Sequence, residues 1–212
     1  MCRILAVQSP RPFDMRGHLR AFARICESSE EYQGHGWGMA WLEGDERRIH
    51  KSLKPVWEED FSGWGRSRFL LAHARSAFRN EGIEIENNMP FFDEKHVFVF
   101  NGELRGVRIR EHGRIGAEKI FNYIKRFYRG DMKAALEKGT GVIIKKTRYV
   151  RAMNIMISDM EKLYFSNIYG ENPAYFSLYR KSEGEVTVHC SQPYPGEAGW
   201  QKLSNHTLGV WP

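Results

Sequence analysis

The chain has 212 residues, of which 42% are apolar and 27% charged, and it carries a net charge of +6. This composition excludes a disordered chain and indicates a globular protein that can bury a core without disulfides or metals. No apolar run reaches the roughly 18–20 residues of a membrane helix, and no secretory hydrophobic segment opens the sequence, so we expect a cytoplasmic protein. The basic residues are scattered rather than clustered, which argues against a nucleic-acid partner.

The first half of the chain is predicted to contain one helix and several strands. The apolar run over 2–9 predicts a strand that Pro10 and Pro12 end, and apolar residues at helical spacing over 19–26 predict a helix. A glycine-rich turn at 34–38 follows. The sequence then predicts a hairpin over 38–53 and a helical turn over 57–61. A buried strand over 69–76, an irregular polar stretch over 78–92 and another strand over 96–102 follow.

The second half begins with helices and ends in strands. Apolar spacing predicts helices over 117–129 and 131–138, whereas 140–150 fits no element clearly. Strands are expected over 152–158, 162–169, 175–181, 186–191 and 207–211. No repeat, low-complexity tract or flexible linker interrupts the chain, so 1–212 is interpreted as one domain. Many strands around a pair of adjacent helices favour an α+β fold, with two sheets stacked face to face and helices outside.

The three cysteines differ in their settings. Cys26 falls in the apolar pattern of a helix and Cys190 in that of a strand, so both are interpreted as small buried hydrophobic residues. No CxxC spacing is present, an odd number of cysteines forms no closed disulfide set, and the histidines lack metal-ligand spacing. The sequence therefore predicts neither a metal nor a cofactor.

Cys2 becomes the first residue when the initiator methionine is removed, as is normal before a small residue. It then carries both a thiol, which is a strong nucleophile as thiolate, and an α-amine with an ordinary pKa of about 7.7–8.0. A largely neutral amine can act as a general base through a water molecule. A cysteine at position 2 also arises by chance, so other motifs must decide between the two interpretations.

Five motifs follow one another in a particular order: MCRILAV at the start, GHGWGMAW over 34–41, HARSAF over 73–78, NNMPFF over 87–92 and FVFNGEL over 98–104. This ordered set, with the C-terminal stretch CSQPYPGEAGWQKLSNHTLGVW, resembles the class II glutamine amidotransferases, the N-terminal-nucleophile (Ntn) group, and in particular their small stand-alone members. The resemblance covers most of the chain. It implies a four-layer αββα sandwich of two mainly antiparallel sheets, with helices over 18–28 and 117–129 covering the outer faces.

The resemblance also implies roles for individual residues. Cys2 would attack the side-chain amide of glutamine or of a γ-glutamyl-type compound, and Asn101 and Gly102 would donate hydrogen bonds to the tetrahedral oxyanion. Arg75 would bind the substrate α-carboxylate. Two local alternatives stay open: Asn101 and Gly102 also fit a tight turn at a strand end, and Arg75 also fits an ordinary ion pair.

Three further positions are candidates for substrate contact. His73 matches the histidine of the family's H-x-R motif, with a structural role favoured over catalysis. Trp37 lies between two glycines and is interpreted as a core aromatic near the floor of the site. Glu118 keeps the glutamate of the family's T-D-S-E run, which otherwise holds the substrate α-ammonium.

The sequence departs from the family pattern at three places. Gly116 stands in the aspartate position of the T-D-S-E run, Met89 replaces the histidine of N-x-H-P-F, and Phe78 replaces a threonine. The first change removes a partner for an ammonium group, and the others would make the pocket more apolar and smaller.

These departures leave two hypotheses. The chain is an active amidohydrolase whose small-molecule amide substrate lacks a free α-ammonium, or it is a catalytically impaired binding or regulatory module. Because a chain of this length has no room for a synthase domain, released ammonia would escape or pass to a separate synthase subunit, and a homo-oligomer is equally open.

Overall fold

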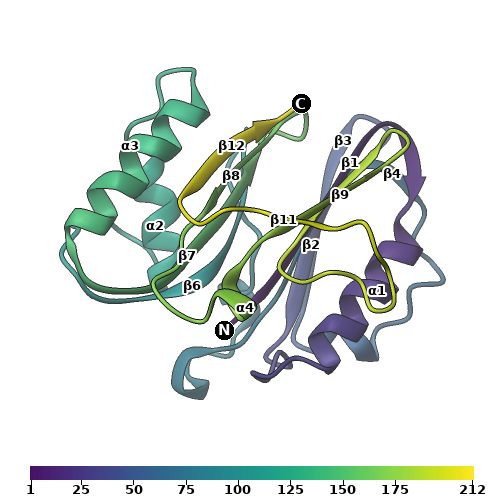
Figure 1. The fold of residues 1–212 in the computed structure, drawn as a ribbon, viewed down its shortest axis with the longest axis horizontal. Coiled ribbons are helices and arrows are strands. Elements are labelled where there is room, and N and C mark those ends of the chain that lie inside the picture. The colour runs from purple at the N-terminus through teal and green to yellow at the C-terminus, as the bar shows by residue number, and fades with distance from the viewer.

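The computed structural model describes residues 1–212 and contains two antiparallel sheets that face each other (Figure 1). The first sheet has seven strands in the order β11-β9-β10-β1-β4-β2-β3, and the second has five in the order β12-β8-β7-β6-β5. The strands of the first sheet are β1 (Arg3–Asp14), β2 (Trp37–Glu43), β3 (Glu46–Ser52), β4 (Arg66–Ala74), β9 (Tyr179–Glu183), β10 (Val186–Cys190) and β11 (Gln201–Lys202). Those of the second are β5 (Phe91–Phe92), β6 (Val97–Val107), β7 (Thr147–Ser158), β8 (Leu163–Asn167) and β12 (Thr207–Trp211).

Helices cover the outer face of each sheet (Figure 1). Helix α1 (Met15–Glu27) begins where the Asp14 side chain accepts a hydrogen bond from the Arg16 amide, and it packs its apolar face on the first sheet. Helices α2 (Gly116–Lys125) and α3 (Met132–Lys145) cover the second sheet, where Phe121 stacks on Phe98 with ring centroids 4.9 Å apart. The predicted four-layer αββα sandwich is confirmed.

Short helical segments complete the chain. They are α4 (Pro173–Phe176) and three 3₁₀ turns, Val56–Glu58, Phe78–Asn80 and Ile85–Asn87. No helix is both long enough and apolar enough to cross a lipid bilayer.

Alternation along the strands decides which side chains face the other sheet, the side that we call the inner face. In β1, Leu5 and Val7 pack with α1, whereas Ile4 packs in the core between the sheets. In β6, Phe98 faces α2, so Val99 and Asn101 lie on the inner face. The beginning of β1 and the middle of β6 therefore present residues to the same space.

Several predicted boundaries were wrong for identifiable reasons. Pro10 and Pro12 do not end β1, because the strand continues to Asp14 after a register shift between Gln8 and Phe13. Proline is tolerated at such an irregularity because no ladder hydrogen bond requires its missing N–H.

The helices also differ from their predicted ranges. The helix expected over 117–129 ends at Lys125, and the one expected over 131–138 continues to Lys145, which accounts for much of the unassigned stretch. The strand expected over 175–181 begins instead as α4, where the Asn172 side chain caps the Tyr175 amide.

Candidate active site

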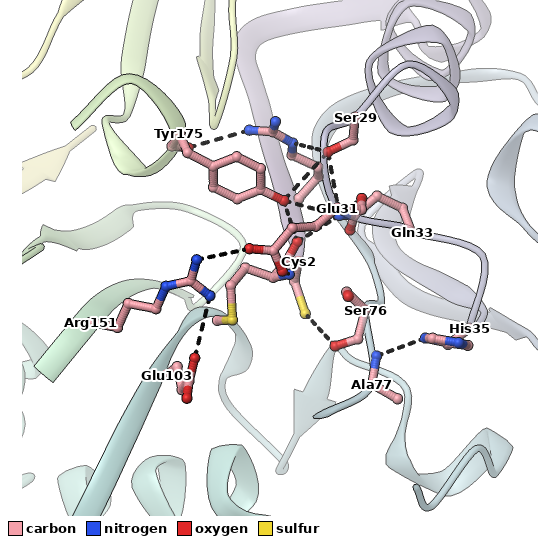
Figure 2. A network of polar contacts seen from close by, with 12 residues as sticks. Cys2, Ser29, Glu31, Gln33, His35, Ser76, Ala77, Glu103, Arg151 and Tyr175 are labelled. Atoms are coloured by element: carbon pink, nitrogen blue, oxygen red, sulfur yellow. Dashed lines mark hydrogen bonds and ion pairs between the residues drawn. The ribbon is translucent and has the colours of Figure 1, made fainter. Parts of the chain in front are cut away.

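Cys2 lies immediately before β1, at one end of the central strand of the first sheet. Arg3 pairs with Ala74 in the register of β1 and β4, so Cys2 lies opposite Arg75. The thiol is 8% exposed, and its Sγ donates to the Ser76 carbonyl at 3.8 Å (Figure 2). Burial raises the pKa of the Cys2 thiol, while the chain's amino terminus and Arg75 act in the opposite direction.

Arg75 is a buried arginine without a carboxylate partner. It is 5% exposed, it makes no ion pair within 4.0 Å, and its Nη1 donates to the Asn88 side-chain oxygen at 3.3 Å. Burial lowers the pKa of Arg75, while nearby Cys2 and Glu84 raise it. The ordinary ion pair considered above is therefore absent, and the remaining guanidinium donors are available for an anionic ligand.

The glycine-rich turn before β2 leaves space for Asn88. Gly36 has a φ of +99°, and a Cβ at this position would lie 2.2 Å from the Asn88 side-chain nitrogen. That nitrogen donates to the Ser52 carbonyl at 2.8 Å, which holds the opposite end of the amide toward Arg75. Position 36 therefore requires glycine, because its φ is positive and a side chain would collide with Asn88. The Asn88 side chain is in turn held where its oxygen accepts from Arg75.

Asn101 is the most unusual polar residue of the inner face. It is completely buried, and neither its side-chain oxygen nor its nitrogen has a hydrogen-bond partner. Its neighbour in the β6–β7 register, Asn154, is fully engaged by contrast: its amide donates to the Phe176 carbonyl at 2.5 Å and accepts from the Ile168 amide at 2.9 Å. A buried unpaired amide costs about 1–3 kcal/mol, so the Asn101 side chain is a functional candidate.

Asn101 and Gly102 lie in the middle of β6, so the alternative of a tight turn at a strand end is wrong. Gly102 has a structural reason to be glycine, since a Cβ would lie 2.1 Å from the Ala152 carbonyl oxygen of β7. The neighbouring strand β7 therefore explains why this position holds glycine.

His73 is fully buried in β4, and its ring faces the backbone of Phe100, the residue before Asn101, without a hydrogen bond of normal geometry. Burial, with a smaller effect from Arg75, lowers the pKa of His73 to about 3. The ring is therefore neutral near pH 7, and its position between β4 and β6 is that of a packing residue.

Trp37 lies on the opposite side of the first sheet. It is fully buried among the residues that pack with α1, and its indole N–H donates to Glu59 at 3.2 Å. The structure does not bring Trp37 to the inner face with Cys2. Its surroundings are those of a core aromatic residue.

Glu118 is engaged by another residue. Its carboxylate accepts hydrogen bonds from the Arg114 guanidinium at 2.5–3.2 Å, and Arg114 lowers its pKa. Both residues line a cavity of about 600 Å³ that also includes Lys51 and Phe121 but neither Cys2 nor Arg75. Glu118 is therefore not free to replace the missing aspartate.

The three departures from the family pattern have different structural settings. Gly116 is the first residue of α2, and no atom lies within 4 Å of the position of an added Cβ. Met89 is buried in the core, with 3% exposure. Phe78 is 58% exposed, so the expectation that it narrows a buried pocket was wrong.

A group of residues that the sequence motifs did not indicate surrounds Met1. Its carbonyl accepts hydrogen bonds from the Gln33 side chain at 2.6 Å and the Tyr175 hydroxyl at 2.5 Å, and its ammonium contacts Glu31. Glu31 is also paired with Arg151 at 3.1 Å (Figure 2). These side chains come from distant parts of the sequence, so no spacing pattern could have connected them.

The sequence matches no protein-family model and no curated protein. Solved structures do share the fold. A protein described as a predicted glutamine amidotransferase from Pseudomonas aeruginosa has a TM-score of 0.62 at 17% identity, with 99% of this chain and 97% of that chain covered. A glutamine aminotransferase class-II domain protein from Silicibacter pomeroyi has a TM-score of 0.66 at 16% identity, with 99% and 94% covered.

A larger protein shares the fold as well. Glutamine phosphoribosylpyrophosphate amidotransferase from Bacillus subtilis, in a complex with ADP and GMP, has a TM-score of 0.63 at 15% identity. The match covers 90% of this chain but 42% of that one, so the chain spans less than half of the larger enzyme. The fold is therefore that of the class II glutamine amidotransferase domain, the Ntn-hydrolase fold. Among the proteins that share it are ones of similar length to this chain.

Proposed function

We propose that this protein is an amidohydrolase in which Cys2, exposed as the first residue by removal of Met1, attacks a side-chain amide and releases ammonia or an amine. The observation that carries the proposal is the buried side-chain amide of Asn101, which has no partner within the fold and lies on an inner face, as Cys2 does by alternation with Ile4. Such an amide is suited to stabilise an oxyanion that forms during the reaction.

The residues support a complete reaction cycle. The α-amine of Cys2 accepts the thiol proton, and the thiolate attacks the amide carbon to form a tetrahedral intermediate. The Asn101 side chain and the Gly102 amide donate hydrogen bonds to its oxyanion. The protonated amine then transfers the proton to the leaving nitrogen, which departs as ammonia or an amine. Water cleaves the resulting thioester and regenerates the thiol.

Arg75 supports a substrate with a carboxylate, because its guanidinium is buried and lacks an acidic partner. Nothing comparable supports a free α-ammonium, since Gly116 has no side chain and Glu118 is held by Arg114. We propose that the enzyme prefers an amide whose α-amino group is absent or acylated. The test compares kcat/KM for glutamine and N-acetylglutamine in the wild type and in Gly116→Asp, a change for which the structure has space.

Ammonia release from glutamine, N-acetylglutamine and γ-glutamyl amides tests the activity itself. Intact mass first establishes that Met1 is absent. We expect Cys2→Ala to abolish release without changing the unfolding midpoint, whereas Cys26→Ala, which removes a buried thiol in α1, retains activity. Full activity of Cys2→Ala would exclude covalent catalysis by this residue.

A non-catalytic binding or regulatory module is the second candidate. The observation in its favour is the burial of the Cys2 thiol, which raises its pKa and lowers the fraction of reactive thiolate. This candidate predicts that the processed protein binds a carboxylate-bearing amide through Arg75 without releasing ammonia. If activity is found, a separate synthase subunit or a second copy of the chain would be the ammonia acceptor to seek.

A further inference from the structure

The carboxylate of Glu31 is divided between two cationic partners (Figure 2). Its Oε1 lies 3.1 Å from Nη2 of Arg151, and its Oε2 contacts the ammonium of Met1. Arg151 belongs to β7 and stays in place, whereas the ammonium of Met1 departs when Met1 is removed. In the processed protein, Oε2 is therefore free to receive another cation next to Cys2.

Arg151 holds this carboxylate in place. Besides Glu31, its guanidinium contacts Glu103 of β6 at 3.4 Å and Glu171 at 2.8 Å, so three acidic residues share its donors. The Arg151 side chain is 24% exposed, which favours a defined geometry over a mobile surface pair. Because Glu103 follows Gly102, the same arginine links Glu31 to the strand that carries the oxyanion donors.

Polar groups that now bind Met1 remain beside the new terminus. Gln33 is completely buried, and it and Tyr175 both donate to the Met1 carbonyl, which departs with Met1. The Oε1 of Gln33 has no hydrogen-bond partner, so an acceptor for an ammonium group is available at the same place. Three covalent bonds of about 1.3–1.5 Å separate the Cys2 nitrogen from the Met1 nitrogen, which contacts Glu31. The Cys2 amine therefore lies within roughly 6 Å of this carboxylate, a range over which a carboxylate stabilises a cation.

We propose that Glu31, held by Arg151, binds and orients the α-amine of processed Cys2 and so determines the pH at which this amine becomes a base. The inference rests on the proposed function. Glu31 is a positioning residue in this scheme, because it contacts the catalytic amine and not the substrate.

The sign of the effect follows from the charges that face the amine. Glu31 favours the ammonium form. Arg3 of β1, which lies over the Tyr175 ring, and Arg75 after β4 and Arg151 of β7 disfavour it. Two further titratable groups, His35 before β2 and the Tyr175 hydroxyl of α4, lie nearby. The carboxylates of Glu103 and Glu171 are paired with Arg151. Loss of the Glu31 charge removes the carboxylate next to the amine while the arginines remain, so the amine should lose its proton at lower pH.

The experiment follows the amine in processed protein that carries ¹³C-labelled cysteine. The Cys2 Cα shift is titrated by NMR, and the kcat/KM pH profile is recorded in parallel. We expect Glu31→Gln to lower the titration midpoint and the acidic limb of the profile by about one pH unit. Glu31→Asp, which keeps the charge, should stay near the wild type, and Glu30→Gln, an exposed neighbour, should change neither readout.

Intact mass and the unfolding midpoint establish that each variant is processed and folded. An unchanged Cα midpoint in folded Glu31→Gln would overturn the inference, as would an equal shift in Glu30→Gln. The NMR titration needs no turnover, so it tests Glu31 even if no amide is hydrolysed. Failure of the proposed function would instead appear as absence of ammonia release in the wild type.

Discussion

Replacement of Arg75 by methionine tests whether the buried guanidinium recognises a substrate carboxylate. Methionine keeps an unbranched apolar side chain and removes the charge. The fold loses little, because the single side-chain hydrogen bond of Arg75 goes to Asn88, which remains bonded to the Ser52 carbonyl at 2.8 Å. The effect should therefore fall on substrate recognition rather than on folding.

The magnitude follows from the bonds that Arg75 can make. One hydrogen bond to a charged group contributes about 1.5–3 kcal/mol, which corresponds to roughly a 10–150-fold loss of kcat/KM. A bidentate contact would lie at the upper end of this range. The loss should apply to glutaramate, which is glutamine without its α-amino group, and not to butyramide, which has no carboxylate.

The assay measures ammonia release at substrate concentrations well below KM, so that the slope gives kcat/KM. Urea unfolding of both proteins serves as the control for folding. The reasoning would be refuted if Arg75→Met lowered butyramide and glutaramate turnover by the same factor, because the arginine would then act on the catalytic centre or the fold. Unchanged glutaramate turnover would refute it equally.

Three other changes have defined outcomes. Asn101→Ala should lower kcat by about 10²–10³-fold with little change in the urea midpoint, since its amide bonds nothing in the fold; a parallel loss of stability would show a structural role instead. Gly102→Ala should lower the unfolding free energy by about 1–3 kcal/mol, because its Cβ would meet the Ala152 carbonyl. An unchanged urea midpoint would contradict this contact. Burial lowers the pKa of His189 to about 3, below its ordinary unfolded value near 6.5, so stability is lost as pH falls through 6.5 toward 3. Between about pH 7 and pH 5.5 this histidine should remove about 1 kcal/mol of unfolding free energy, and His189→Leu should show a smaller difference between urea unfolding at the two pH values.

The layered architecture could be predicted because strand periodicity and the ordered motifs agree with each other. Strand periodicity alone did not predict which face of the sheet Trp37 occupies. Trp37 pairs with Ala74 in the β2–β4 register, and both pack toward α1, one step out of phase with His73 and Arg75. The glycines around Trp37 do not reveal which face of the strand it occupies.

Parts of the candidate site could be named from the sequence, and others could not. Cys2, Arg75 and Asn101 were indicated by motif order, and the structure gives each a distinctive setting; their catalytic roles stay predictions. Glu31 and Arg151 are separated by more than a hundred residues and meet because the two sheets pack together. An isolated glutamate or arginine carries no local signal for such a meeting, so these residues required the structure.

The central position of β1 has a consequence for synthesis on the ribosome. This N-terminal strand lies between β4 and β10, so one of its edges has no partner until the nascent chain has reached residues 186–190. In the finished fold, the Met1 side chain is 11% exposed and its carbonyl is bonded to Gln33 and Tyr175. We therefore expect the aminopeptidase to remove the methionine while the chain is still being translated, before β10 pairs with β1.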